Sequence, residues 1–229
     1  MEQAIRFHET GGPEVLRLED VVVGEPGPGE VRLRHVAVGL NFADTYFRNG
    51  TYPIPLPAGM GVEAAGVVEA VGPGVTNVAV GDKVTYTGFL NTLGAYSTAR
   101  IIAAAPLIRL PAGIECETAA AMTMRGLTSA YLMRRIYPFK QGDTILLHAA
   151  AGGVGLIVSQ WAKLLGLSVI GTVSTEEKAK VARAHGCDHT INYSHEDVAT
   201  RVRELTGGVG VSVVFDSVGR TTFMASLDS

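Results

Sequence analysis

A cluster of small residues directly after an apolar run carries the clearest chemical signal in the sequence. Residues 149–155 read AAAGGVG and follow the apolar run 144–148. Small residues at a strand-to-helix turn let the backbone approach a pyrophosphate, which the first amides of the helix then bind. Because Ala150 occupies the first of the three small-residue positions, the turn is a variant of G-x-G-x-x-G, and a tight packing turn is the alternative interpretation. The residues predicted to contact a dinucleotide are Ala150, Gly152, Gly153, Val154 and Gly155.

The residues after the next predicted strand bear on the choice between NAD and NADP. A carboxylate there would bind the ribose 2′-hydroxyl of NAD and would repel a 2′-phosphate. The sequence instead has Ser174 or Thr175 at that place, and Lys178 follows within one helical turn. NADPH is therefore the predicted cofactor, with Ser174 and Lys178 near its 2′-phosphate. In a structural interpretation, Ser174 caps the next helix with Glu177 as its capping-box partner, and Lys178 is a solvated charge. The two interpretations are compatible, because a capped helix start leaves Lys178 free to reach a phosphate.

The elements that position these residues alternate between strand and helix. Strands are expected at 144–148, 168–173, 190–193 and 211–216, and helices at 117–135, 153–165, 176–185 and 197–205. This order predicts an α/β fold with a doubly wound parallel sheet. In the first half, runs of period two at 31–40, 62–71 and 83–87 are separated by glycine and proline turns, which is typical of an antiparallel β domain. We therefore predict two domains, residues 1–124 and 125–229.

The composition restricts the class of protein. The 229 residues are 47% hydrophobic and 18% charged with a net charge of −3, which excludes disorder and makes nucleic acid an unlikely partner. The longest run of apolar residues and glycine, 149–158, is far shorter than the roughly 18 residues needed to span a bilayer. The first residues lack the apolar stretch of a signal peptide, so we expect a cytoplasmic protein. The two cysteines, Cys116 and Cys187, indicate neither a disulfide framework nor a metal site.

The segment 142–155, GDTILLHAAAGGVG, resembles the signature of the zinc-independent quinone oxidoreductases, the zeta-crystallin group of the medium-chain dehydrogenase/reductases. Further segments that resemble this group are 11–16, 39–46, 61–66 and 126–131, so the resemblance covers essentially the whole chain. It implies a GroES-like β domain beside a Rossmann domain, with the active site in the cleft between them. It also implies a quinone as the substrate and a homodimer for the complete protein.

The resemblance assigns roles to individual residues. It implies that Asn41, Asp44 and Tyr46 form the catalytic motif: Asn41 binds a cofactor or substrate oxygen, Asp44 orders the loop and Tyr46 lines the quinone pocket. Arg48 and Tyr52 are further candidates for the pocket, and a role in loop packing is the alternative for Asn41 and Tyr52. The remaining residues implied in cofactor binding are Thr128, Tyr193 and Ser217.

The zinc-dependent relatives of this group carry a cysteine and a histidine where this chain has Asn41 and Val62. Neither residue replaces a thiolate or an imidazole at a tetrahedral zinc, so we expect no metal. Hydride transfer to a quinone needs orientation and hydrogen bonding more than acid catalysis. Two alternatives remain open. One is an alkenal or enoyl reductase, which would need a proton donor such as Tyr46 or Tyr52. The other is a non-catalytic NADPH-binding or RNA-binding protein.

A complete sheet of this type has six strands, and this chain supplies four. We therefore expect a truncated chain in which two βα units and the segment that completes the GroES-like domain are missing. The predicted strand 211–216 would then be an exposed edge, which is an aggregation hazard. The chain alone should be poorly soluble or weakly active.

Overall fold

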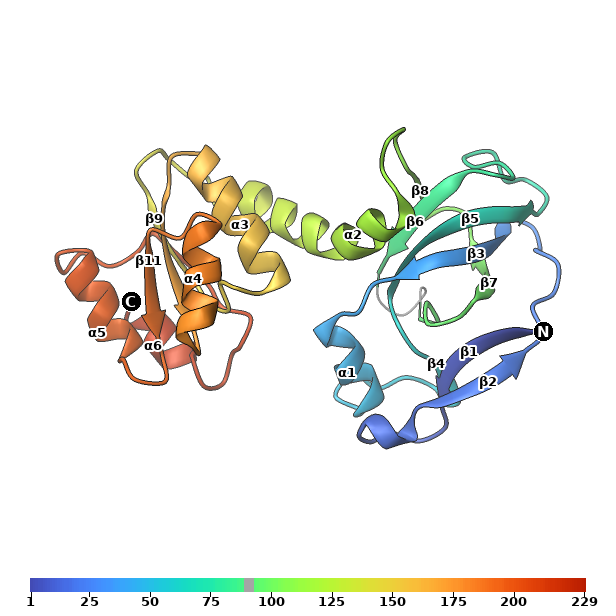
Figure 1. Cartoon of the computed structure of the whole chain (residues 1–229), viewed down its shortest axis with the longest axis horizontal. Coiled ribbons are helices and arrows are strands. Elements are labelled where there is room, and N and C mark those ends of the chain that lie inside the picture. Colours follow the sequence, from blue (N-terminus) through green and yellow to red (C-terminus); the bar gives the residue numbers. More distant parts are fainter. Residues whose placement is uncertain (89–92) are drawn as a thin grey trace. The chain divides into compact units, whose positions relative to one another are not determined.

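The computed structural model describes residues 1–88 and 93–229, which form two compact units (Figure 1). The first unit comprises Met1–Met124 and the second comprises Arg125–Ser229. The boundary lies within α2 (Cys116–Tyr131). Each unit has its own sheets and its own hydrophobic core, and each is described separately.

The first unit contains two antiparallel sheets. In one, the strands run in the order β2-β1-β4; in the other, they run in the order β7-β3-β5-β6-β8. The strands are β1 (Glu2–Phe7), β2 (Arg17–Val21), β3 (Glu30–Val38), β4 (Ala58–Gly59), β5 (Glu63–Val71), β6 (Lys83–Thr87), β7 (Ala99–Ala103) and β8 (Ile108–Arg109). Alternation of apolar side chains along β3 buries Val31 and Leu33 in the core of this unit. A 3₁₀ turn, Pro13–Val15, and α1 (Phe42–Arg48) complete the unit.

Close approach of the two central strands requires glycine at one position. A Cβ atom built on Gly66 of β5 would lie 2.0 Å from the carbonyl oxygen of Arg34 in β3. The register between these strands shifts next to this contact, between His35 and Ala37. Such irregularities bend a strand and change where its end points. The end of β3 leads into the segment before α1, where the catalytic motif was predicted.

The second unit contains one parallel sheet in the order β11-β10-β9-β12. Its strands are β9 (Thr144–Leu147), β10 (Ser168–Val173), β11 (His189–Asn192) and β12 (Val213–Phe215). Its helices after α2 are α3 (Gly153–Leu164), α4 (Glu176–Ala184), α5 (Val198–Leu205) and α6 (Phe223–Leu227).

Both faces of this sheet are covered by helices. Leu147 of β9 packs in the cluster that includes Val158 of α3, whereas the adjacent Leu146 packs with Val202 of α5. Successive side chains of a strand point to opposite faces, so the apolar run on β9 serves two layers of helices. The predicted doubly wound α/β fold and the antiparallel first domain are confirmed.

The structure corrects several predicted elements. The helix expected at 117–135 is an α-helix only to Tyr131 and continues as a π-helical turn, Leu132–Ile136. The strand expected at 211–216 is reduced to β12, because the Val211 amide donates to the carbonyl oxygen of Ser229 (3.1 Å) instead of joining the sheet. In the described part of the chain, β12 is an edge strand, as expected. A search of the described residues finds no helix with the length and apolarity of a membrane span.

Candidate active site

The glycine-rich turn joins the carboxyl end of β9 to the amino end of α3. Gly152 is the N-cap of α3, and the first hydrogen bond of the helix runs from the Leu156 amide to the Gly152 carbonyl oxygen (2.9 Å). The amides of Gly153, Val154 and Gly155 precede this bond and therefore have no acceptor within the helix. Such amides, together with the positive end of the helix dipole, form an anion-binding site. The structure thus places the predicted pyrophosphate residues at one helix terminus.

Tight packing beneath the turn explains its small residues. A Cβ atom on Gly155 would lie 2.5 Å from the carbonyl oxygen of Ala150 and 2.6 Å from that of Ala149. Ala150 is fully buried, and a Cβ atom on Gly171 of β10 would lie 2.6 Å from the Ala150 methyl group. Larger side chains at these positions would push the turn away from the sheet. The turn therefore keeps the shape that suits a pyrophosphate only with glycine or alanine at these positions.

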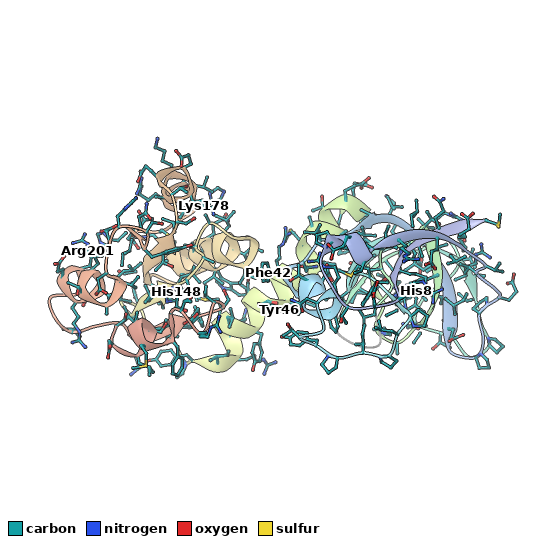
Figure 2. The ribbon with its side chains drawn as sticks, turned by 90° about the horizontal axis from the view of Figure 1, so that it is seen from below. His8, Phe42, Tyr46, His148, Lys178 and Arg201 are labelled. Atoms are coloured by element: carbon teal, nitrogen blue, oxygen red, sulfur yellow. The ribbon has the colours of Figure 1, made fainter. Side chains whose placement is uncertain are left out.

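Three predicted cofactor residues meet at the carboxyl ends of β10 and β11. The Lys178 ammonium donates to the Ser174 hydroxyl oxygen at 2.9 Å. The Lys178 side chain is exposed (Figure 2), and Ser174 is half-buried. The Tyr193 amide donates to the carbonyl oxygen of Val173 (3.1 Å), which places Tyr193 beside Ser174. The helix cap is Thr175, whose hydroxyl oxygen accepts from the Lys178 amide, so the alternative with Ser174 as the cap is wrong.

Thr128 and Ser217, the remaining predicted cofactor residues of this unit, lie on other elements. Thr128 lies on α2, one turn after Arg125, and a Cβ atom on Gly153 would lie 2.5 Å from the Arg125 side chain. Ser217 is exposed in the loop after β12. Asp216 orders that loop by accepting from the Gly219 amide (2.9 Å). Burial alone would raise the pKa of Asp216, but hydrogen bonds from Gly219 and nearby hydroxyl groups outweigh this effect and lower it to about 2.

His148 connects the glycine-rich turn to this loop. Its ring nitrogens lie 3.0 Å from the Thr172 hydroxyl oxygen and 3.1 Å from the Ser226 hydroxyl oxygen. The Ser226 hydroxyl donates to the Asp216 carboxylate (2.7 Å). Burial lowers the pKa of His148, so the ring is neutral at neutral pH. The His148 side chain is 3% exposed and has hydrogen-bond partners at both ring nitrogens, which is typical of a structural histidine.

In the first unit, Asn41 and Asp44 are joined at the start of α1. Asn41 is the N-cap, and its backbone N–H donates to the Asp44 carboxylate at 2.9 Å. The same carboxylate oxygen accepts from the Tyr96 hydroxyl (2.7 Å). Asp44 is buried, which raises its pKa. These contacts let Asp44 order the motif, which is the role that the resemblance implied.

Glu63 is a site residue that the sequence analysis did not identify. Its side chain is 1% exposed at the start of β5. One carboxylate oxygen accepts from the Asn41 side-chain amide (2.7 Å), and the other accepts from the backbone amide of Met124 (2.6 Å). The sequence held one sign of this role: Glu63 is a carboxylate at the start of an otherwise mostly apolar strand. Because buried charges are rare unless they have partners, such a residue indicates a hydrogen-bonded site.

Aromatic rings cover the exposed side of α1. Phe42 and Tyr46 make an edge contact with a centroid separation of 5.4 Å (Figure 2), and Tyr52 makes edge contacts with Tyr46 (5.3 Å) and Phe47 (5.4 Å). Phe42 is 74% exposed, so this aromatic group, Phe42, Tyr46 and Tyr52, presents apolar surface beside Asn41, whereas Phe47 is buried beneath it. Arg48 instead donates to the Gly11 carbonyl oxygen (3.2 Å), which ties α1 to the loop before β2.

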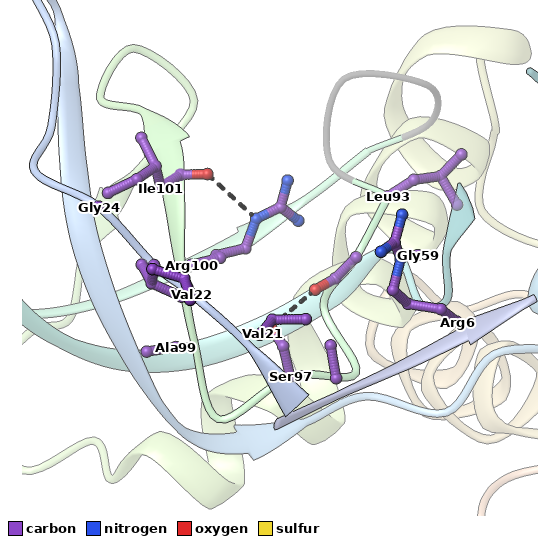
Figure 3. Close-up of a pocket in the computed structure, with 13 residues that line it drawn as sticks. Arg6, Val21, Val22, Gly24, Gly59, Leu93, Ser97, Ala99, Arg100 and Ile101 are labelled. Carbon is purple, nitrogen blue, oxygen red and sulfur yellow. Dashed lines mark hydrogen bonds between the residues drawn. The ribbon is translucent and has the colours of Figure 1, made fainter. Parts of the chain in front are cut away.

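Asn41 and Val62 stand where the zinc-dependent relatives carry a cysteine and a histidine ligand. Val62 is fully buried, and the Asn41 amide nitrogen faces a carboxylate. Among residues 1–88 and 93–229, no group of three histidine, cysteine, aspartate or glutamate side chains is arranged to hold a metal. A shallow pocket of about 330 Å³ lies elsewhere on this unit, near Arg6 and Arg100, and contains none of the predicted site residues (Figure 3).

Comparison with known proteins matches both units. The model of the alcohol dehydrogenase GroES-like domain matches residues 27–112, and that of the zinc-binding dehydrogenases matches residues 153–229. The chain is 56% identical to a quinone oxidoreductase of Pseudomonas aeruginosa and 51% identical to a 2-haloacrylate reductase of a Burkholderia species. Both alignments cover all of this chain and 70% of the relative.

A solved structure extends the comparison to three dimensions. The structure of Escherichia coli quinone oxidoreductase complexed with NADPH is similar to this chain with a TM-score of 0.95 and 49% identity. The match covers 99% of this chain and 69% of that protein. The resemblance found in the motifs therefore holds for the whole chain.

Proposed function

Because the chain belongs to the quinone oxidoreductase family of the medium-chain dehydrogenase/reductases, we propose that it reduces quinones with NADPH as the hydride donor. Membership in this family makes it an oxidoreductase. The chain spans about 70% of the length of these relatives.

The cofactor is NADPH, and the observation that carries this part of the proposal is the arrangement of the second unit. The free amides at the start of α3 suit a pyrophosphate, and the Ser174–Lys178 pair offers a hydroxyl and an ammonium group to a 2′-phosphate. The complex of the Escherichia coli relative with NADPH supports the same choice. When bound, this cofactor supplies the hydride.

Asn41 and the aromatic group would bind and orient the substrate. A quinone is flat and apolar with two carbonyl oxygens, so it suits exposed aromatic rings next to an amide. Phe42 and Tyr46 provide such rings, and Asn41 provides hydrogen-bonding atoms at the start of the same helix. Tyr52 extends the aromatic surface. Asp44 orders the motif through its hydrogen bonds with the Asn41 backbone and the Tyr96 hydroxyl, and it needs no contact with the substrate.

Reduction of an activated carbon–carbon double bond is the second candidate, because the Burkholderia relative is a 2-haloacrylate reductase. That reaction must protonate carbon after hydride addition, whereas a reduced quinone accepts protons on oxygen. We expect the protein to oxidise NADPH with 1,4-benzoquinone at least about 100-fold faster, in kcat/KM, than with 2-chloroacrylate. The loss of NADPH absorbance, followed with each substrate in turn, gives the two values of kcat/KM. A quinone value lower than the 2-chloroacrylate value would favour the second candidate.

We also expect the purified protein to hold no stoichiometric zinc and to keep its activity in chelator. The reason is the chemistry of the side chains at the expected ligand positions: Val62 has no donor atom, and the Asn41 nitrogen donates to Glu63. Plasma emission spectroscopy gives the metal content, and quinone reduction is assayed before and after dialysis against EDTA. One zinc per chain, with activity lost on chelation, would contradict this expectation.

A further inference from the structure

The Glu63 carboxylate is held in one place by surrounding backbone. A Cβ atom on Gly39 would lie 2.2 Å from the Glu63 oxygen that accepts from Asn41, and 2.6 Å from the carbonyl oxygen of Ala120. Only glycine at position 39 leaves room for this approach. The other Glu63 oxygen is held by the Met124 amide. The carboxylate therefore meets Asn41 in a defined position.

The chemistry of a carboxylate determines how the Asn41 amide is oriented. An ionised carboxylate only accepts hydrogen bonds, whereas an asparagine side chain has one accepting oxygen and one donating nitrogen. The nitrogen Nδ2 must therefore face Glu63, as the 2.7 Å contact has it. The oxygen Oδ1 must then point away from Glu63. Without such a partner, the two ends of the amide could exchange places.

We propose that Glu63 is a positioning residue that fixes the polarity of the Asn41 amide, so that Oδ1 is held as an acceptor for a hydroxyl group of the bound cofactor or substrate. This inference rests on the proposed role of Asn41 in binding. The hydroxyl belongs either to the cofactor ribose or to the hydroquinone, and separate measurements distinguish these two sources.

Glu63→Gln tests the proposal because it changes polarity with little change of shape. The introduced glutamine can accept from Met124 only if its nitrogen faces Asn41, and the Asn41 amide must then turn its nitrogen outward. We expect a loss of about tenfold. It should appear in the Kd of NADPH, measured by fluorescence titration, if the ribose is the partner. It should appear in kcat/KM for quinone, with the Kd unchanged, if the hydroquinone is the partner.

A second substitution should restore the acceptor. In the Glu63→Gln background, Asn41→Asp provides a carboxylate that accepts from the introduced glutamine and points its other oxygen outward, and the total charge of the pair is unchanged. We expect the double variant to recover to within about threefold of the wild type. Asn41→Asp alone places two carboxylates face to face and should be worse than the double variant.

These outcomes separate positioning from a purely structural role. If Glu63 only supported the fold, the losses of the two single variants would add, and the double variant would be the most impaired. That result would overturn the proposal, as would wild-type behaviour of Glu63→Gln when Asn41→Ala is impaired. If Asn41→Ala itself keeps wild-type binding and turnover, the proposed role of Asn41 fails. Thermal unfolding followed by circular dichroism verifies that each variant is folded.

Discussion

Replacing Gly155 with alanine should weaken NADPH binding by about 100-fold or more, equivalent to about 2.7 kcal/mol. The added methyl group would lie 2.5 Å from the Ala150 carbonyl oxygen and 2.6 Å from the Ala149 carbonyl oxygen. Both are backbone atoms under the turn, so no side-chain rotation can relieve the contact. The turn must open, and the amides of Gly153 and Val154 then lose their common direction. Fluorescence titration with NADPH measures the loss.

Gly24→Ala is the matched control for this prediction. It makes the same chemical change at an exposed position where an added Cβ meets no atom within 4 Å and where the backbone has no positive φ. The control should bind NADPH as the wild type does. Wild-type affinity in Gly155→Ala would show that the turn tolerates a side chain, and the pyrophosphate site would have to be placed elsewhere.

The double substitution Ser174→Asp with Lys178→Ala should reverse the cofactor preference, from at least tenfold in favour of NADPH to about tenfold in favour of NADH. An aspartate suits the free ribose hydroxyls of NADH and repels a 2′-phosphate. Both residues must change together, because the Lys178 ammonium lies 2.9 Å from the Ser174 hydroxyl and would form an ion pair with an aspartate there. Titration with the two nucleotides at several salt concentrations measures the preference.

Lys180→Ala serves as the control, because it removes the same charge from the same exposed helix. It should leave the preference for NADPH intact, apart from a small change that salt screens. Equal affinity of the wild type for both nucleotides would refute the assignment of Ser174 and Lys178. If Lys180→Ala lowered the preference for NADPH as much as the double substitution does, net charge and not a specific contact would govern the choice of nucleotide.

Local patterns predicted the parts of the fold that are decided locally. The glycine-rich turn and the alternation after it identified the parallel sheet, because apolar runs and turns are read within a few residues of one another. The interpretation of Ser174 as the N-cap of α4 was one residue early, since Ser174 and Thr175 are both good caps and only the backbone distinguishes them. Strand β12 was predicted too long, because the Val211 amide bonds instead to Ser229.

Contacts between distant segments could not be predicted in the same way. Asn41 and Asp44 were identified from their motif, but Glu63 lies on another strand, and its partner Met124 lies on α2. A carboxylate in an apolar strand shows that some partner must exist and does not say which one. Likewise, Tyr96 supports Asp44 across 52 positions of the chain. Such pairings depend on sheet register and helix placement, which the sequence specifies only through the complete fold.

Because Thr175 caps α4, the residue before it has no part in starting the helix. Ser174 and Lys178 also contribute nothing to the buried clusters of their unit. On the proposed assignment, nucleotide preference therefore depends on side chains that do not build the core. During evolution, a lineage whose cells supply more of one reduced nucleotide can adapt through substitutions at these two surface positions. Because neither side chain packs in the buried clusters, we expect each single variant along this path to unfold at nearly the same temperature as the wild type.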